Sequence, residues 1–170
     1  MNDQELFQAI IDTSFVKTDV MRRTRIIREF LEQKFYTPGE KRGLTAFLEH
    51  TNTSDDDMKI MEHWGEPFFN SFTKENAYDL LENVKGRMND LPTINLYVPL
   101  TLGPTDIPRL GAWCRKNIDK NILIELHVEP STFGGCAFAW NGIYMDYSLR
   151  HYLRKRLDAV RNILSDYEKK

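Results

Sequence analysis

The residue whose side chain is most suited to chemistry is Cys136, which follows two glycines in the segment VEPSTFGGCAFAWNGIYMDYSL (residues 128–149). A cysteine nucleophile needs a neighbouring base to take its proton. The nearest bases in sequence are His127 and His151. Thiol chemistry therefore requires a fold that brings one of these imidazoles to the sulfur. The alternating apolar residues around Cys136 favour a strand instead, in which a free cysteine behaves as a small apolar side chain.

The glycine pair Gly134-Gly135 suggests either a ligand cradle or a structural turn. A phosphate-binding loop needs spaced glycines followed by Lys-Ser or Lys-Thr, and a dinucleotide fingerprint needs GxGxxG between a strand and a helix. Neither pattern is present. The glycines open a predicted hairpin, where they permit a bulge or a close backbone crossing that leaves no room for a Cβ atom. We interpret them, with Pro130 at the end of the preceding strand, as structural.

Patterns for metals and cofactors are missing from the sequence. The histidines form neither an HExxH motif nor a compact set with Cys or Asp, and they are His50, His63, His127 and His151. The acidic run at residues 55–57 lacks the glycine and distant glutamate of a calcium loop. It fits a helix start capped by Ser54. The sequence thus predicts no catalytic residue, no cofactor and no metal.

The elements that must position these residues fall into two halves. Residues 1–91 carry apolar residues at helical spacing in several short amphipathic segments, which predicts a helical bundle. The stripes of the first two helices contain Ile10, Ile11, Ile26 and Ile27. The second helix also carries the basic stretch MRRTRIIRE, which we interpret as a solvated face.

In residues 92–170 the spacing of apolar residues changes from helical to alternating. TINLYVPL and NILIELHVEP alternate like half-buried strands, with a helix predicted between them. Asn141-Gly142 favours the type I′ turn of a hairpin between two further strands. The fold class is therefore α+β, an N-terminal helical bundle (1–91) followed by a small β-α-β-β-α domain (92–170).

A long helix is predicted from about residue 148 to 167, with Asp146 and Ser148 as its cap. Its apolar residues repeat in steps of four and three, which is a heptad seam formed by Leu153, Leu157, Val160 and Leu164. The seam fits two uses, covering the domain's own sheet or docking against a long partner helix. We expect the seam mainly to cover the domain's own sheet. The basic stretch RHYLRKR on the same helix is a second candidate surface for nucleic acid or anionic lipid.

The composition limits the classes of protein to which the chain can belong. With 41% hydrophobic residues, the 170-residue chain can build a core without disulfides, and two cysteines outside any CxxC pair indicate free thiols in a reducing compartment. A net charge of −2 argues against a dedicated nucleic-acid binder. No apolar run reaches the ~20 residues that span a bilayer. We expect a soluble chain without a targeting peptide, which meets membranes only peripherally.

The segment that contains the glycine pair resembles the signature of the delta subunit of F-type ATP synthases, the oligomycin-sensitivity-conferring protein family. That signature runs from a Val-acid-Pro-Ser turn to Gly-Gly, then through a strand, a turn glycine and an Ile-Asp-x-Ser segment into an amphipathic helix. The matching residues are Val128, Glu129, Pro130, Ser131, Gly134, Gly135, Gly142, Asp146, Ser148, Leu149 and Leu153. The order of elements extends the resemblance to about residues 93–165. Thr132-Phe133 stands where the family has an aliphatic pair.

The resemblance implies a non-catalytic stator subunit of a proton-translocating ATP synthase. In that family the N-terminal bundle binds N-terminal segments of alpha subunits, and the C-terminal domain binds the C-terminal helices of membrane-anchored b subunits. The link converts rotor torque to ATP synthesis at the cytoplasmic face of the inner (plasma) membrane. Candidate contacts are Ile10, Ile11, Ile26 and Ile27 for alpha, and Leu153, Leu157, Val160 and Leu164 for b. No nucleic acid is expected, and the membrane is met only through partners.

Three alternatives remain open. The stalk subunit of vacuolar- or archaeal-type ATPases shares a glycine pair in an α+β domain, but usually opens with a long charged helix. Breaks at Pro38, Gly39, Gly65 and Pro67 disfavour that helix here. A nucleic-acid or membrane-surface adaptor would use the basic helices. A small cysteine-dependent enzyme would use Cys136.

Overall fold

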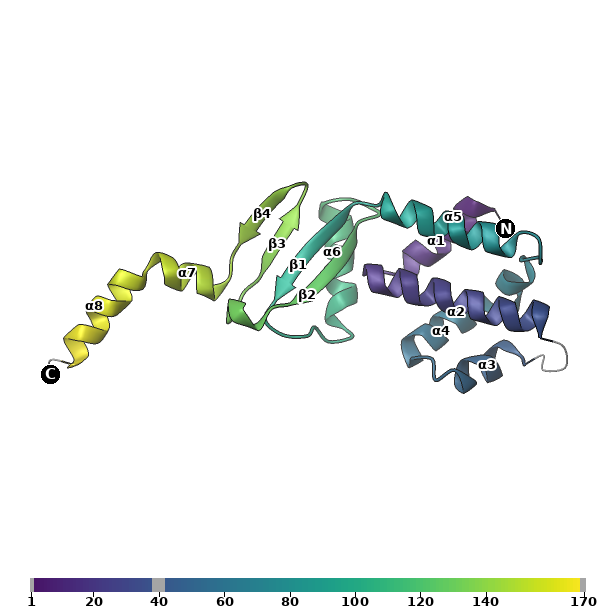
Figure 1. The fold of residues 1–170 in the computed structure, drawn as a ribbon, viewed down its shortest axis with the longest axis horizontal. Coiled ribbons are helices and arrows are strands. Elements are labelled where there is room, and N and C mark those ends of the chain that lie inside the picture. The colour runs from purple at the N-terminus through teal and green to yellow at the C-terminus, as the bar shows by residue number, and fades with distance from the viewer. Residues whose placement is uncertain (1, 38–41, 169–170) are drawn as a thin grey trace. The chain divides into compact units, whose positions relative to one another are not determined.

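The computed structural model describes residues 2–37 and 42–168, apart from the side chains of residues 158, 160, 166 and 168. Two compact units divide the chain, an N-terminal unit (Met1–Leu91) and a C-terminal unit (Pro92–Lys170). Eight α-helices and one four-stranded mixed sheet lie in the described residues, with the strands confined to the C-terminal unit (Figure 1). The predicted α+β class is confirmed. The predicted break at Pro38 and Gly39 lies outside the described residues.

Five helices lie in the described part of the N-terminal unit. They are α1 (Asp3–Thr13), α2 (Lys17–Tyr36), α3 (Leu44–His50), α4 (Asp55–Asn70) and α5 (Ala77–Asn89). The first begins with a capping box, in which Asn2 Oδ1 accepts from the Glu5 amide and Glu5 Oε2 accepts from the Asn2 amide, each at 2.9 Å. The apolar stripes of α1, α2 and α5 are buried against one another, as the bundle prediction requires.

The predicted break at Gly65 is present, as a kink that divides α4. Gly65 has a φ of 66°, outside the helical region, and the chain resumes a helical path through Pro67 to Asn70. Proline is tolerated there because it lies in the first turn after the kink, where its missing amide costs no helical hydrogen bond. The rings of Trp64 and Phe68 stack across the kink with centroids 4.7 Å apart. The start of α4 is capped as predicted, since Ser54 Oγ accepts from the Asp57 amide.

One arginine of the basic stretch on α2, Arg23, is buried, which corrects the interpretation of that residue as part of a solvated face, whereas Arg25 is exposed as interpreted. The Asp57 carboxylate is fully buried and accepts hydrogen bonds from Arg22, Arg23 and Ser54. Arg23 is buried as well and also donates to Ser14 Oγ at 2.8 Å. This cluster joins the end of α1, the start of α2 and the start of α4.

The C-terminal unit is built on a sheet of order β2-β1-β3-β4 (Figure 1). Its strands are β1 (Thr93–Val98), β2 (Leu123–Val128), β3 (Ala137–Trp140) and β4 (Ile143–Asp146). Helix α6 (Asp106–Asn117) connects β1 to the parallel strand β2, whereas β3 and β4 add as an antiparallel hairpin. Asn141 and Gly142 turn the hairpin with φ values of 48° and 76°, the positive pair that a type I′ turn needs.

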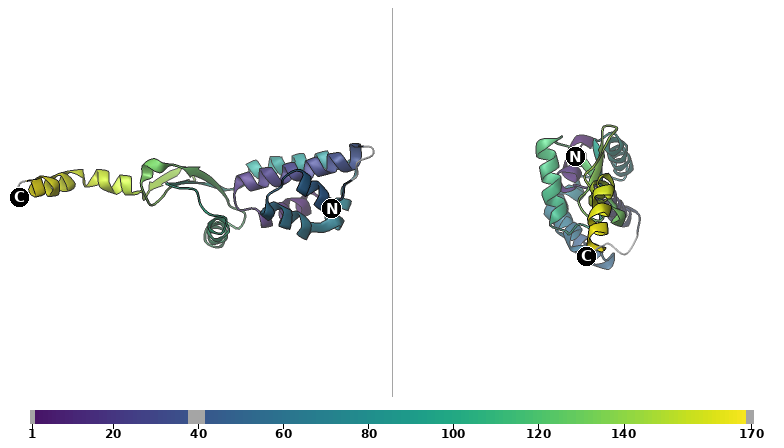
Figure 2. Two further views of the ribbon diagram at one scale, coloured as in Figure 1. Left: turned by 90° about the horizontal axis from the view of Figure 1, so that it is seen from below. Right: turned by 90° about the vertical axis from the view of Figure 1, so that its left-hand side faces the viewer.

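The two faces of this sheet differ in chemistry. Ladder pairs Ile94–Ile124 and Leu96–Leu126 share one face with Val98, and α6 lies against that face (Figure 2). The opposite face carries Tyr97, His127 and Tyr144, whose rings contact one another along the register. Alternation along each strand therefore puts an apolar surface under α6 and leaves an aromatic, polar surface on the other side.

The closing helix is divided in two. Helix α7 (Leu149–Lys155) ends at Arg156, whose φ and ψ of −116° and 18° leave the helical region, and α8 (Leu157–Glu168) follows. Both extend away from the sheet (Figures 1 and 2). The expectation that the heptad seam mainly covers the domain's own sheet is wrong, because Leu153, Leu157 and Leu164 are exposed. Within the described residues, no helix combines the length and apolarity that crossing a membrane requires.

Candidate functional site

The glycine pair forms a close crossing of two backbones. Gly135 has a φ of 71°, and a Cβ atom there would overlap the carbonyl oxygen of Tyr147. Hydrogen bonds of 2.9 Å tie the two strands of the crossing, from the Tyr147 amide to the Cys136 carbonyl and from the Leu149 amide to the Gly134 carbonyl. Gly134 is less constrained, since its Cβ would lie 3.8 Å from that of Leu149. The crossing directs the chain from β4 into α7.

The cap of α7 is made by the two residues that the sequence pairs for this role. Ser148 Oγ accepts from the His151 amide at 3.2 Å, and Asp146 Oδ1 accepts from the Ser148 amide at 2.9 Å. Hydrogen bonding with Ser148 lowers the pKa of Asp146, with a smaller contribution from His151. Pro130 begins the short 3-10 turn η1 (Pro130–Thr132), against which α7 packs. These contacts fix the direction in which α7 leaves the sheet.

The structure gives Cys136 no basic partner among the described residues. His127 stacks on Tyr97 and lies 3.2 Å from Asn95 Oδ1, whereas His151 lies 3.8 Å from Asp146. The second cysteine, Cys114, is buried on α6, and burial raises the pKa of its thiol. A higher pKa leaves less of the reactive thiolate at neutral pH. The arrangement supplies no activated thiol.

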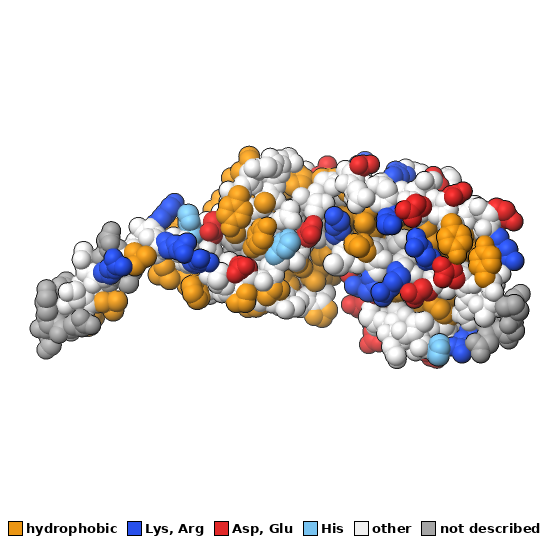
Figure 3. All heavy atoms as spheres, viewed as in Figure 1, with side chains coloured by type: hydrophobic (Ala, Val, Ile, Leu, Met, Phe, Trp, Pro, Cys, Tyr) orange, Lys and Arg blue, Asp and Glu red, His pale blue; other side chains and the backbone are white. Residues whose placement is uncertain are grey.

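The heptad seam is exposed on α7 and α8. The exposed fractions of Leu153, Leu157 and Leu164 are 44%, 42% and 59%. Val160 belongs to the same predicted set, but its side chain lies outside the described residues. Further exposed large apolar residues on these helices are Leu149, Tyr152, Ile163 and Tyr167. In Figure 3, apolar side chains lie among basic ones on this part of the chain, and exposed apolar patches are typical of partner-binding surfaces.

The four isoleucines predicted to contact an alpha subunit are core residues. Ile10, Ile11, Ile26 and Ile27 are all buried in the N-terminal unit, where α1, α2 and α5 pack together. A partner cannot contact them while the bundle stays closed. Among its described residues, this unit exposes the large apolar side chains of Met21, Tyr36 and Tyr78. They lie off the helical stripes, and that position is the sequence signal by which they could have been found.

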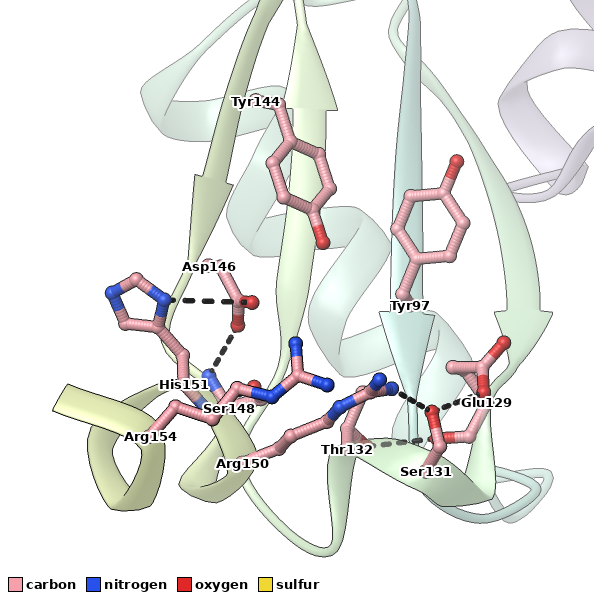
Figure 4. A pocket seen from close by; sticks show the side chains of 10 residues that line it. All are labelled: Tyr97, Glu129, Ser131, Thr132, Tyr144, Asp146, Ser148, Arg150, His151 and Arg154. Carbon is pink, nitrogen blue, oxygen red and sulfur yellow. Dashed lines mark hydrogen bonds and ion pairs between the residues drawn. The ribbon is translucent and has the colours of Figure 1, made fainter. Parts of the chain in front are cut away.

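A polar pocket in the C-terminal unit was not predicted from the sequence. It has a volume of about 510 Å³ and lies between the aromatic face of the sheet and α7 (Figure 4). The residues that line this polar pocket include Tyr97, Glu129, Ser131, Tyr144, Asp146, Arg150, His151 and Arg154. Strand alternation places the tyrosines and Asp146 on one face, but the position of α7, which supplies the arginines, depends on the crossing at Gly135.

Comparison with known proteins adds no relative. No protein-family model matches the chain, and no curated protein matches it in sequence. The functional argument therefore depends on the residues and their geometry.

Proposed function

We propose that this protein is a peripheral-stalk subunit of an F-type ATP synthase. In this role it has no catalytic activity. The C-terminal unit binds the C-terminal helices of b subunits, and the N-terminal unit binds N-terminal segments of alpha subunits. The chain is then held at the cytoplasmic face of the inner membrane by its partners, and it keeps the catalytic head from turning with the rotor.

One observation carries this proposal, the exposed seam on α7 and α8. Leu157 and Leu164 keep heptad spacing within α8, and Leu153 lies on α7 before the break at Arg156; none of the three is buried against the sheet. Full burial of a leucine side chain contributes roughly 1.5–3 kcal/mol, so a seam of this kind favours binding when a helix covers it. A long apolar-striped helix is the partner whose repeat matches the seam.

The residues that position the start of α7 also support the stalk-subunit proposal. The residues that resemble the delta-subunit signature perform connected structural tasks here, with Gly135 at the crossing and Asp146 and Ser148 at the cap. They aim a helix pair away from the sheet. This is the arrangement that a stalk-binding domain needs, because its docking helices must be free of its own core.

The N-terminal unit needs a different alpha-binding surface from the one first predicted. The rings of Tyr36 and Tyr78 are exposed with centroids 6.4 Å apart, and Lys74 lies over Tyr36. Tyrosine is enriched among residues that dominate binding energy at protein interfaces. We assign the alpha contact to this exposed pair in place of the buried isoleucines.

The test is affinity purification of the tagged chain from detergent-solubilised native membranes, with mass spectrometry of the co-purifying proteins. Alpha, beta and b subunits in fixed proportion support the proposal. Vacuolar-type subunits would favour the alternative stalk, and recovery of neither set would overturn both. Leu164→Glu should abolish co-purification of b, whereas the matched control Asn162→Glu, at an exposed polar residue on the same helix, should retain it.

A membrane-surface adaptor is the second candidate, favoured by the exposed cations Arg154, Lys155 and Arg156 beside the seam. Basic and apolar residues on one helical segment suit an anionic bilayer surface. Sedimentation with vesicles that contain phosphatidylserine tests it. The stator proposal expects no salt-sensitive vesicle binding by the chain alone, and the adaptor requires it.

A further inference from the structure

Two arginines of α7 point across the polar pocket. Arg150 and Arg154 are four residues apart, so their side chains leave the same side of the helix. Figure 4 shows both guanidinium groups directed toward the aromatic face of the sheet. Arg150 Nη1 donates to Ser131 Oγ at 2.7 Å, while Arg154 forms no ion pair or hydrogen bond with the described residues. Like charges at this spacing repel each other, and an anion between them would remove that repulsion.

The carboxylates of the pocket are already bound by protein donors. Glu129 Oε1 accepts from Ser131 Oγ at 2.5 Å, and Asp146 accepts from the Ser148 amide. His151 Nδ1 lies 3.8 Å from the other Asp146 oxygen. The charges of the lining nearly balance, so net charge alone does not select a ligand. The ligand is therefore selected by the hydrogen-bond donors that remain directed into the pocket.

Those donors match three acceptor atoms. The donors are the guanidinium of Arg154, the remaining N–H groups of Arg150 and the hydroxyl of Tyr144, which points toward the arginines in Figure 4. A phosphate monoester presents three terminal oxygens, whereas a carboxylate presents two. The planar guanidinium fork also suits phosphate oxygens better than a point charge does.

The other wall of the pocket is aromatic. Tyr97 turns the face of its ring to the pocket and is itself stacked on His127, with centroids 4.7 Å apart and planes 18° apart. The ring of Tyr144 lies beside this wall, with its centroid 6.2 Å from that of Tyr97. The volume of about 510 Å³ lies within the roughly 300–1,000 Å³ of small-molecule sites. There is space for an organic group beside the phosphate, and a flat one suits this wall.

We propose that the polar pocket binds a phosphate monoester of a small molecule with a flat organic group. Arg150, Arg154 and Tyr144 hold the phosphate, and Tyr97 contacts the organic group. The site lies wholly within the C-terminal unit and does not depend on the stator role. It remains a binding site whether or not the seam on α7 and α8 binds a partner helix.

The test titrates the full chain with phenyl phosphate, inorganic phosphate and benzoate, followed by ¹H–¹⁵N NMR. Phenyl phosphate should give saturable shifts at the amides of β4, η1 and α7. Inorganic phosphate should bind the same residues more weakly because it lacks the ring. Equal or tighter binding of benzoate would overturn the phosphate assignment, and absence of saturable shifts with phenyl phosphate would overturn the site.

Matched variants separate this site from general attraction of anions. Arg154→Gln should weaken phenyl phosphate binding by about tenfold or more, since a hydrogen bond to a charged group contributes roughly 1.5–3 kcal/mol. Arg156→Gln removes the same charge two residues away, outside the pocket lining, and should leave the affinity unchanged. Both side chains are exposed, so both variants should fold. Equal weakening in the two variants would show an unspecific effect of charge and overturn the proposal.

Discussion

Gly135 and the carbonyl oxygen of Tyr147 lie so close that a Cβ atom on Gly135 would overlap that oxygen. Gly135 also has a positive φ of 71°. The two constraints act together, because a side chain would both strain the local backbone and push apart the segments that enter β3 and leave β4. The direction of α7, and with it the seam and the polar pocket, depends on this crossing.

Gly135→Ala should destabilise the chain strongly. Backbone strain at a positive φ costs roughly 1–3 kcal/mol, and displacement of the Tyr147 backbone adds to it. Gly134→Ala is the control, since its φ is not positive and its Cβ would make only an ordinary contact. Urea denaturation should show a loss of about 2 kcal/mol or more for the first variant and under ~1 kcal/mol for the second. Equal losses would contradict the close-crossing interpretation.

Removal of the α7 cap should have a smaller effect. Ser148→Ala together with Asp146→Ala removes the side chain that accepts from the His151 amide and the carboxylate that accepts from the Ser148 amide. A lost cap typically costs ~1 kcal/mol. Thermal melting should show a clear reduction in Tm, and a change close to zero would rule out the capping role.

The sequence predicted the local elements well because their signals are local. The strand periods, the Asn141-Gly142 turn and the Ser148 cap depend on neighbours within a few residues, and the structure shows each of them. The break at Arg156 was missed because no proline or glycine marks it. The periodic apolar pattern continues through that residue, so one long helix was the natural prediction.

Long-range chemistry was harder to predict from sequence. Arg23 and Asp57 are 34 residues apart, and nothing in either local segment distinguishes this buried pair from the exposed charges beside it. The polar pocket likewise joins strands to a later helix whose direction depends on Gly135. The apolar period identified the stripes but not which of them faces solvent, so the isoleucines predicted to contact a partner are buried and the leucines expected mainly to cover the sheet are exposed.

The buried ion cluster of the N-terminal unit should make its stability depend on pH. Burial alone would raise the pKa of Asp57, but hydrogen bonds from Arg22, Arg23 and Ser54 outweigh it and leave the pKa below its ordinary value of 3.8. A carboxylate with a lowered folded pKa stabilises the fold above its unfolded pKa. That contribution should be lost as pH falls below about 3.8 toward the folded pKa.

Asp57→Asn should remove most of this contribution at neutral pH. Breaking a buried ion pair by removing one charge costs roughly 3–5 kcal/mol, since Arg23 would stay buried without its partner. Asp55→Asn, on the same helix turn but exposed, should cost under ~1 kcal/mol. Urea denaturation between pH 3 and pH 7 should give a flatter pH dependence for Asp57→Asn than for the parent chain. Parallel curves would exclude Asp57 as the titrating group.

The seam and the buried stripe should respond oppositely to truncation. Ile27 is fully buried, so Ile27→Ala should cost roughly 2–5 kcal/mol of unfolding free energy by leaving a cavity. Leu164 is exposed, so Leu164→Ala should change the unfolding free energy by no more than ~0.5 kcal/mol. Only the second substitution should weaken recovery of b subunits in the affinity purification. A large stability loss for Leu164→Ala would mean that α8 packs within its own unit, and the seam would then no longer be available as a docking surface.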